Sequence, residues 1–394
     1  METLIHQSEI LRDSVPTGFR RYLLDEIPWD DRLICIKGAR GVGKTTLLLQ
    51  HLALHLPDDG TALYISMDDL FFTDEGLLSF AKKFQLIGGK TLLLDEVHKY
   101  PGWSREIKLI YDQIPSLKIV ITSSSILNIF KGESDLSRRA LSYTLKELSL
   151  REYIALKGTD LSSFSLEEIL TDHKTISKSI LKSVSPVKEF VEYSKMGAYP
   201  YFDQKDYLQR LLRTIQVAID IDLNAVEQFD YGMLVKMKQL LYVISGSVPF
   251  TPNITSLSKK MGMSRPTLLK GLQVLEKARL LIGLHRNTKG VGLLTKPDKL
   301  YLNNPNLMYA LNTENVNIGN IRETFFLNQL SDIHKVCMAD KADFIVDDKY
   351  TFEVGGRKKG IGQITNTSDA FVVKDDIEIG YGNVIPLWLF GFLY

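Results

Sequence analysis

The chain has 394 residues, more than one hydrophobic core normally supports, and is expected to fold into two to four domains. Its 44% hydrophobic and 24% charged residues are ordinary for a soluble globular protein, and a net charge of +1 excludes bulk attraction to nucleic acid or membranes. Two cysteines, Cys35 and Cys337, lie far apart in apolar surroundings. They predict neither a disulfide framework nor a metal knuckle and indicate a reducing compartment.

The two ends of the chain carry no sign of a secretory or membrane segment. The first residues, METLIHQSEILRDS, lack the basic-then-apolar order of a secretory signal, and no run approaches the ~18 apolar residues of a membrane span. The last stretch, VIPLWLFGFLY, is apolar but short, which favours a buried terminal strand over an anchor. We therefore expect a cytoplasmic protein without membrane contact.

A phosphate-binding loop is predicted at residues 38–46, GARGVGKTT, between a strand-like run at residues 33–36 and a helix-like run. The string fits G-x-x-x-x-G-K-[ST] without a gap, so backbone N–H groups and a helix N-terminus would surround an anion. Lys44 would reach the β- and γ-phosphates, and the Thr45 hydroxyl would bind Mg²⁺. The predicted nucleotide-binding residues of this loop are Gly38, Ala39, Arg40, Gly41, Val42, Gly43, Lys44, Thr45 and Thr46.

Two acids follow a buried strand about fifty residues downstream. The string TALYISMDD reads as a second strand and KTLLLDEVHKY as a third, which ends on Asp95 and Glu96. Parallel strands present such carboxylates beside the phosphate loop. Asp95 would hold Mg²⁺ through water or Thr45, and Glu96 would orient or deprotonate the attacking water.

Two pairs of neighbouring polar residues in the same region are further candidates for contact with the nucleotide. The strand-like run SLKIVITSSS ends in serines, so Ser123 and Ser124 are expected to sense the γ-phosphate or to cap the next helix, with equal weight. Arg138 and Arg139 would stabilise the transferred phosphoryl group as an arginine finger, in the same molecule or in a neighbour. A distant or solvated salt bridge is an equally good interpretation of either arginine.

The strings TLLLDEVHKYPGWSREIKLIYDQIP, ITSSS and LSRRALSYTLKELSLREY follow one another in this order, within a match that covers residues 16 to about 155. In that order they resemble the archaeal-type branch of the extended AAA ATPases, the DExx-box proteins. The resemblance implies a five-stranded parallel sheet with the phosphate loop after the first strand. It also implies ATP rather than GTP as the ligand, and an ATPase core at residues 1–150.

Residues 151–235 show helical periodicity in VKEFVEYSKMGAYPYF and YLQRLLRTIQVAIDIDL. The resemblance implies a helical lid over the nucleotide, and plain packing is the alternative.

Residues 236–300 predict a winged helix-turn-helix: Leu257 faces inward, Ser264 caps the second helix, and two strand-like runs flank a turn at residues 287–290. The inward positions of the second helix are Leu268, Leu269, Leu272 and Leu275.

Positive charge is concentrated in this third segment, with a local balance of +8 over residues 257–299. A basic winged helix is typical of duplex DNA binding, although such modules also serve protein contacts. The acids there are Glu276 and Asp298; the basic residues are Lys259, Lys260, Arg265, Lys270, Lys277, Arg279, Arg286, Lys289, Lys296 and Lys299.

Residues 301–394 resemble the restriction-nuclease-like domain that accompanies this ATPase family. On that resemblance Glu323, Asp343 and Glu353 fall where metal-binding acids stand, and such ligands suit Mg²⁺ or Mn²⁺. The lysine expected two residues after Glu353 is replaced by Gly355, with Lys358 or Lys359 as the substitute. We therefore favour a domain that binds without cutting.

The sequence as a whole predicts an α/β protein: a P-loop NTPase sheet, a helical lid, a winged helix-turn-helix and a C-terminal α/β nuclease-like domain. The predicted function is an ATP-binding and ATP-hydrolysing switch, with Mg²⁺ as cofactor, coupled to a basic winged helix that contacts double-stranded DNA. The alternatives are an ATP-gated metal-dependent DNA nuclease and a slow-turnover signalling ATPase that acts on a protein partner.

Overall fold

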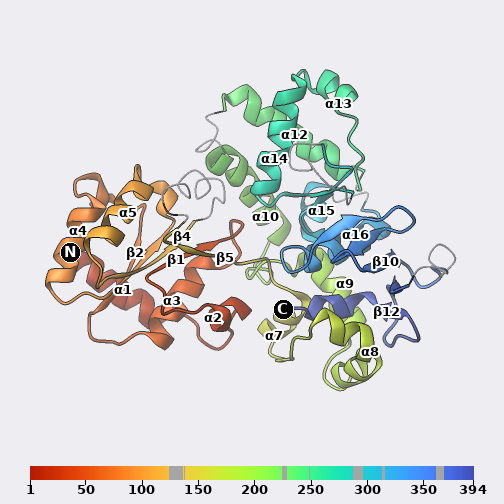
Figure 1. The fold of residues 1–394 in the computed structure, drawn as a ribbon, viewed down its shortest axis with the longest axis horizontal. Helices are drawn as coiled ribbons and strands as arrows, with labels where there is room; N and C mark the ends of the chain where they lie inside the picture. Colours follow the sequence, from red (N-terminus) through yellow and green to blue (C-terminus); the bar gives the residue numbers. More distant parts are fainter. Residues whose placement is uncertain are drawn as a thin grey trace. The chain divides into compact units, whose positions relative to one another are not determined.

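A computed structural model describes residues 1–123, 136, 138–223, 229–247, 249–286, 296–312, 316–360 and 368–394 (Figure 1). The chain divides into two compact units. Unit 1 comprises Met1–Glu147 with Ile221–Gln228, and unit 2 comprises Leu148–Asp220 with Phe229–Tyr394. The finer division into four domains stays a prediction.

Unit 1 is built on a five-stranded parallel sheet with the strand order β2-β3-β4-β1-β5 (Figure 1). Every residue of β1 and β3 is buried, as expected for a parallel sheet covered on both faces. This confirms the predicted sheet. Its strands are β1 (Leu33–Lys37), β2 (Ala62–Ser66), β3 (Thr91–Asp95), β4 (Lys118–Thr122) and β5 (Leu141–Thr144).

Alternate strand residues form the core of unit 1 with two helices. Leu92 and Leu94 of β3 and Ile119 and Ile121 of β4 point to one face, because side chains alternate along a strand. The apolar faces of α4 and α5 cover that face. The helices of unit 1 are α1 (Glu2–Ser14), α2 (Tyr22–Glu26), α3 (Lys44–His55), α4 (Leu77–Leu86) and α5 (Trp103–Gln113), with 3-10 turns η1 (Leu70–Thr73) and η2 (Val97–Lys99).

The first helices of unit 2 pack against the C-terminal part of the chain. α7 (Leu150–Leu156) and α8 (Leu166–Ile180) contact the 3-10 helix η5 (Leu387–Phe392), and α9 (Pro186–Met196) and α10 (Tyr207–Val217) contact α15 (Pro305–Leu311). These helices therefore pack within unit 2, and the lid predicted for residues 151–235 stays a prediction. A π-helical turn, η3 (Ala218–Leu223), follows α10.

Three helices and a two-stranded sheet follow, α12 (Tyr231–Ser245), α13 (Ile254–Met261), α14 (Arg265–Lys277), β6 (Leu281–Leu284) and β7 (Lys299–Leu302). Gly262, with φ 57°, ends α13, and the Ser264 side chain accepts the Thr267 N–H at 3.2 Å to begin α14. The predicted turn at residues 287–290 lies outside the described residues. The inward residues are buried, except for half-buried Leu269: Leu257, Leu268, Leu272 and Leu275.

The C-terminal sheet is mixed, with the order β12-β11-β10-β9-β8, and α16 (Ile318–Leu330) packs on β10. β10, β11 and β12 are parallel, whereas β8, β9 and β10 are antiparallel. The strands are β8 (Val336–Met338), β9 (Phe344–Val346), β10 (Tyr350–Gly355), β11 (Ala370–Lys374) and β12 (Val384–Pro386).

The apolar end of the chain is buried, but it is a strand only in part. β12 covers three residues and η5 replaces the rest of the predicted strand, with Leu387 and Leu389 fully buried. Ser149, which caps α7, donates its hydroxyl to the Tyr394 carbonyl at 2.8 Å. No helix of the described residues is long and apolar enough to cross a membrane.

Candidate nucleotide-binding site

The phosphate-loop motif forms the turn between β1 and α3. Gly43 caps α3 with φ 98°, a left-handed conformation that side chains resist. At Gly38 a Cβ atom would lie 2.5 Å from the Leu145 carbonyl oxygen, so only glycine fits. Backbone conformation and close packing therefore explain the two fixed glycines of the motif.

Lys44 is turned into its own loop. Its ammonium donates to the carbonyl of Gly38 at 2.9 Å and to that of Ala39 at 2.8 Å, and the residue is 6% exposed. A buried ammonium needs such acceptors, because an unpaired buried charge is costly. The lysine therefore stands beside the anion site predicted from the motif, held by bonds that a phosphate oxygen could replace.

Asp95 joins the phosphate loop to the neighbouring strand β3. Thr45 Oγ1, at the start of α3, donates to Asp95 Oδ2 at 2.6 Å, so the two predicted Mg²⁺ ligands are in contact. Tyr64 donates to the same carboxylate oxygen at 2.9 Å, and Thr122 donates to Asp95 Oδ1. Three neutral hydroxyls thus compensate a carboxylate that is 3% exposed. Carboxylate and hydroxyl oxygens are hard ligands, and this donor set fits Mg²⁺.

Glu96 follows directly, in a strained backbone conformation. Its φ of 52° and ψ of 45° are left-handed, which costs a non-glycine residue about 1–3 kcal/mol and is found mainly at functional sites. The Thr122 hydroxyl accepts the Glu96 N–H at 3.0 Å and holds this turn. The Thr122 hydroxyl therefore orients both acids, because it donates to the Asp95 carboxylate and accepts the backbone N–H of Glu96.

Lys99, in the turn η2, forms ion pairs with Glu96 and with Asp68. Burial alone would raise the pKa of Glu96, but the hydrogen bond and positive charge of Lys99 outweigh it and lower that pKa. The same lysine, by its hydrogen bond, lowers the pKa of Asp68. Lys99 thereby stabilises the ionised form of Glu96 and holds its carboxylate in place, and the role of Glu96 as a base stays a prediction.

The serines after β4 are only partly described. Ser123 is fully buried, and its hydroxyl lies 3.0 Å from His98 Nδ1, in the turn that follows Glu96. Its backbone N–H donates to the Ile36 carbonyl of β1 at 3.3 Å. Ser124 lies outside the described residues. The geometry places Ser123 beside the acidic turn, and the sensor role stays a prediction.

Arg138 and Arg139 precede β5, at the end of the sheet away from the phosphate loop. β5 runs parallel to β1 with Leu141 opposite Ile34. The phosphate loop begins beyond the other end of β5, about 13 Å further along at 3.3 Å per residue. This placement gives no support to a finger role in the same molecule, and the predicted role, in the same molecule or in a neighbour, stays a prediction.

The contacts of Arg139 agree with this placement. Its Nε and NH2 donate to the Asp112 carboxylate near the C-terminus of α5, at 2.9 and 3.1 Å. Arg32, which precedes β1, lies 4.0 Å from the centre of the neighbouring Tyr111 ring. Arg138 is exposed. The salt-bridge interpretation thus holds for Arg139.

Sequence reasoning missed three residues of the site: Tyr64, Thr122 and Lys99. Tyr64 lies in an apolar strand, and no pattern distinguishes it from a core tyrosine. Thr122 stands at the end of β4, where a polar residue after a buried run marks the carboxyl edge of a parallel sheet. Lys99 follows Glu96 by three residues, a spacing that brings side chains together in a helical turn. Thr122 and Lys99 therefore carried a usable signal.

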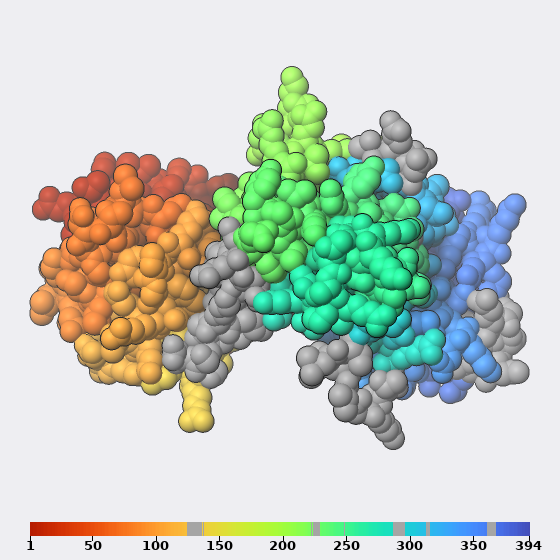
Figure 2. Space-filling view, turned by 90° about the horizontal axis from the view of Figure 1, so that it is seen from above, coloured from red at the N-terminus to blue at the C-terminus, as the bar shows by residue number. Residues whose placement is uncertain are grey.

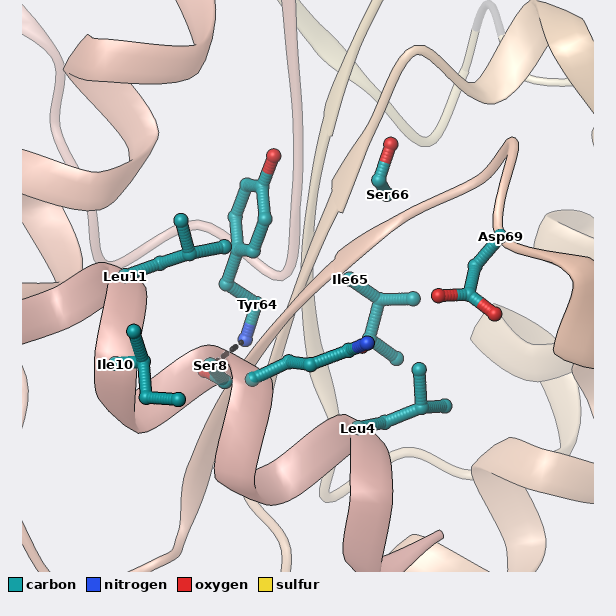
Figure 3. A pocket seen from close by; sticks show the side chains of 9 residues that line it. Leu4, Ser8, Ile10, Leu11, Tyr64, Ile65, Ser66 and Asp69 are labelled. Carbon is teal, nitrogen blue, oxygen red and sulfur yellow. Dashed lines mark hydrogen bonds between the residues drawn. The ribbon is translucent and has the colours of Figure 1, made fainter.

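A cavity of about 310 Å³ lies between α1 and β2, at the edge of the sheet away from β1 (Figure 3). Ser8 of α1 accepts the Tyr64 N–H at 3.0 Å across its floor. Two strands, β3 and β4, separate β2 from β1, so this cavity is not the phosphate site. It is lined by Leu4, Gln7, Ser8, Ile10, Leu11, Tyr64, Ile65, Ser66 and Asp69.

Unit 2 exposes much of the predicted basic surface, and α13 and α14 lie on the face seen in Figure 2. Arg279 instead forms an ion pair with Asp332, Lys299 is half-buried, and Lys289 lies outside the described residues. The exposed basic residues are Lys259, Lys260, Arg265, Lys270, Lys277, Arg286 and Lys296.

The three C-terminal acids are each engaged. Glu323 accepts the Tyr301 hydroxyl at 2.8 Å, and Asp343 accepts the Val354 N–H at 2.8 Å. Glu353 is 2% exposed and pairs with Lys359 at 2.5 Å. Burial, and secondarily the charge of Asp343, raise the pKa of Glu323.

Lys359 is therefore the lysine that reaches the predicted acids. Its own pKa is raised, since its hydrogen bond to Glu353 and the charges of Asp343 and Glu323 outweigh burial. In the described part of the chain, no group of three or more His, Cys, Asp or Glu residues is arranged to hold a metal ion. The second metal site stays a prediction without support from the geometry.

Comparison with known proteins agrees with the nucleotide-binding site described for unit 1. Residues 30–154 match the AAA domain family. The uncharacterized protein MJ1637 of Methanocaldococcus jannaschii is 31% identical over 269 residues, which cover 64% of this chain and 56% of that relative. The chain thus spans little more than half the length of the curated relative that it matches.

Two solved structures are more distant. The Walker-type ATPase PABY2304 of Pyrococcus abyssi is 13% identical, with a TM-score of 0.42 over 76% of this chain and 99% of that one. AMPPCP-bound DnaA from Aquifex aeolicus is 16% identical, with a TM-score of 0.29 over 68% of this chain and 86% of that one. At such TM-scores neither similarity carries an argument.

The family match, the parallel sheet and its phosphate loop together show an AAA-type P-loop ATPase domain in unit 1.

Proposed function

We propose that unit 1 binds ATP with Mg²⁺ and hydrolyses it to ADP and phosphate. The observation that carries the proposal is the 2.6 Å hydrogen bond between Thr45 Oγ1 and Asp95 Oδ2. It joins the two halves of a nucleotide site, the phosphate loop after β1 and the acid at the end of β3, although fifty residues separate them in the chain.

The residues divide the work by their chemistry. The loop N–H groups and Lys44 bind the phosphate chain, and Lys44 exchanges its loop carbonyls for phosphate oxygens. Thr45 and Asp95 hold Mg²⁺, which would neutralise charge that develops on the transferred phosphoryl group. Glu96, ionised beside Lys99, accepts a proton from the attacking water at its carboxylate.

We further propose that the nucleotide state of unit 1 controls a DNA contact made by unit 2. The exposed lysines of α13 and α14 support this, since Lys259, Lys260 and Lys270 all face solvent. Exposed basic residues on a helix-turn-helix meet DNA phosphates, with a dependence on salt that measures the number of contacts. Changing Lys259 and Arg265 to Glu should flatten that dependence, and an unaltered slope would favour a protein partner instead.

The hydrolysis proposal is tested with two substitutions in unit 1. Lys44→Ala should remove ATP binding in calorimetry with Mg²⁺, because the loop loses its cation. Glu96→Gln should retain ATP binding and lower turnover by roughly 10²–10⁴-fold, the range for a general base. Lys82→Ala, which alters an exposed lysine of α4, is the matched control and should leave both unchanged.

Three outcomes separate the alternatives. Equal turnover in the wild type and the Glu96→Gln variant would contradict the assignment of the base. Purified protein with bound ADP and almost no turnover would favour the slow signalling ATPase. Cleavage of supercoiled DNA with Mn²⁺ and ATP, lost in Glu353→Gln, would favour the nuclease.

A further inference from the structure

Arg21 is a buried arginine that joins three segments of unit 1. It is 4% exposed and precedes α2. One nitrogen, NH1, donates to the Val42 carbonyl in the middle of the phosphate loop at 2.5 Å. The other, NH2, donates to the carbonyls of Lys146 and Glu147 at 2.7 and 3.2 Å. A guanidinium has the planar fork of donors that such a bridge needs, whereas a lysine does not.

The bond to Val42 fixes the orientation of the next N–H group. In a planar trans peptide the C=O and the following N–H point in opposite directions. Since the Val42 carbonyl points at Arg21, the Gly43 N–H points away from Arg21. Gly43 is also the N-cap of α3, with φ 98°, so its N–H belongs to the group that a phosphate meets at the start of this helix.

Residues 144–147 are attached to the end of β1, directly before the phosphate loop, and to α2. Leu145 donates its N–H to the Lys37 carbonyl at 2.7 Å, and a Cβ atom at Gly38 would lie 2.5 Å from the Leu145 carbonyl oxygen. The Tyr22 hydroxyl donates to the Thr144 carbonyl at 3.1 Å. This segment ends at Glu147, the last residue of unit 1 before the chain enters unit 2 at Leu148.

We propose that Arg21 is a positioning residue that orients the Gly43 N–H for the nucleotide phosphates and couples the phosphate loop to the segment that leads into unit 2. The inference rests on the proposed ATP binding of unit 1. A phosphate that tightens the loop acts on the Val42 carbonyl, and the shared guanidinium passes the change to the Lys146 and Glu147 carbonyls. Residues 144–147 thereby report nucleotide occupancy to the junction between the units.

The substitution Arg21→Lys tests both parts, because it keeps the charge but removes the fork. It should raise the KM for ATP about tenfold or more, the effect of losing one hydrogen bond to a charged group, with kcat within about twofold. In the wild type, ATP with Mg²⁺ should slow hydrogen exchange at the amides of residues 144–148. In Arg21→Lys that protection should disappear at saturating ATP.

Two further variants make the result decisive. Arg20→Lys alters the adjacent, exposed arginine and should behave as the wild type in KM and protection. Tyr22→Phe removes the hydroxyl bond to Thr144 without touching the loop, and should weaken the protection while KM is unchanged. Thermal melting without nucleotide establishes that each variant is folded; if Arg21→Lys is not, Tyr22→Phe decides the coupling.

The failure of this inference is distinguishable from failure of the proposed function. If the wild type binds ATP, and Arg21→Lys and Tyr22→Phe both match Arg20→Lys in KM and protection, the inference is overturned and ATP binding stands. If the wild type binds no nucleotide, the proposed function itself is wrong and the inference falls with it.

Discussion

The two units compensate their buried acids in different ways. In unit 1, Asp95 is 3% exposed and is surrounded by the hydroxyls of Thr45, Tyr64 and Thr122. In unit 2, Glu353 is 2% exposed and is paired with the ammonium of Lys359. These partners of the first carboxylate are thus neutral hydroxyls, whereas the second carboxylate is paired with a cation of the chain.

This difference decides which acid can take an external cation. A hydroxyl that turns away from Asp95 leaves a carboxylate whose charge attracts Mg²⁺, and Thr45 can itself become a ligand. A metal at Glu353 would first have to displace Lys359, at the cost of separating a largely buried ion pair. The comparison explains why the acids of unit 1 are expected to function with a metal and those of unit 2 are not.

The largest effect is expected where the acid of unit 1 loses its charge. Asp95→Asn keeps the shape of the side chain, but it replaces one accepting oxygen by an amide donor and removes the negative charge that attracts Mg²⁺. ATP hydrolysis should therefore fall by about 10²-fold or more. Steady-state phosphate release with varied Mg²⁺ measures it. Asp58→Asn, at an exposed aspartate, is the control. Hydrolysis within threefold of the wild type would show that Asp95 is a structural acid, like those of unit 2.

The second effect is on the stability of unit 2. Lys359→Met leaves the buried Glu353 carboxylate without its ion-pair partner. The other oxygen of that carboxylate, Oε2, has no hydrogen-bond partner even in the wild type. The loss should be about 2 kcal/mol of unfolding free energy, below the value for a fully buried pair because the Lys359 side chain is 35% exposed. Urea unfolding measures it, and Lys358→Met, at the adjacent exposed lysine, should have little effect.

A second substitution separates the unpaired acid from lost packing. Double substitution of Lys359→Met with Glu353→Gln removes the buried charge together with its partner and should restore part of the loss. Urea unfolding of the single and double variants measures it. A deficit that Glu353→Gln leaves unchanged would indicate lost packing rather than an unpaired acid.

Local patterns predicted the ATPase sheet well, because its signals are contained in short stretches. The run before residue 38, the glycines of the loop and the acids after β3 each determine their own local conformation, and parallel pairing brings them to one edge. The C-terminal strand was predicted too long. Pro386 has no N–H to continue the strand, so the chain turns into η5, although its residues are apolar throughout.

The site was predicted only where its residues share a motif. Thr45 and Asp95 were found because each stands at a fixed place beside a strand end. Arg21 and Tyr64 were not, because their partners depend on tertiary contacts: Arg21 meets carbonyls more than one hundred residues away, at Lys146 and Glu147. The position of Arg138 could not be predicted for the same reason, since only the sheet shows at which end β5 begins.

A smaller effect concerns the pH dependence of the base in unit 1. Lys99 lowers the pKa of Glu96, so in Lys99→Met the carboxylate should protonate at higher pH and the acidic limb of kcat/KM should shift upward. Lys99→Arg keeps the charge and should leave the limb in place. A pH profile of ATP hydrolysis measures both variants. An unmoved limb in Lys99→Met would mean that Glu96 is not the base, or that Lys99 serves Asp68 alone.

The smallest effect is expected at the arginines beside β5. Arg138 is exposed, at the end of the sheet opposite the phosphate loop, so Arg138→Ala should change the turnover of dilute, monomeric protein by less than about twofold. Measuring turnover over a dilution series separates two cases, because an arginine that acts on a neighbouring molecule matters only at concentrations that permit association. A loss of tenfold or more that persists at the lowest concentration would contradict the placement of this residue, and with it the parallel pairing of β5 to β1 in solution.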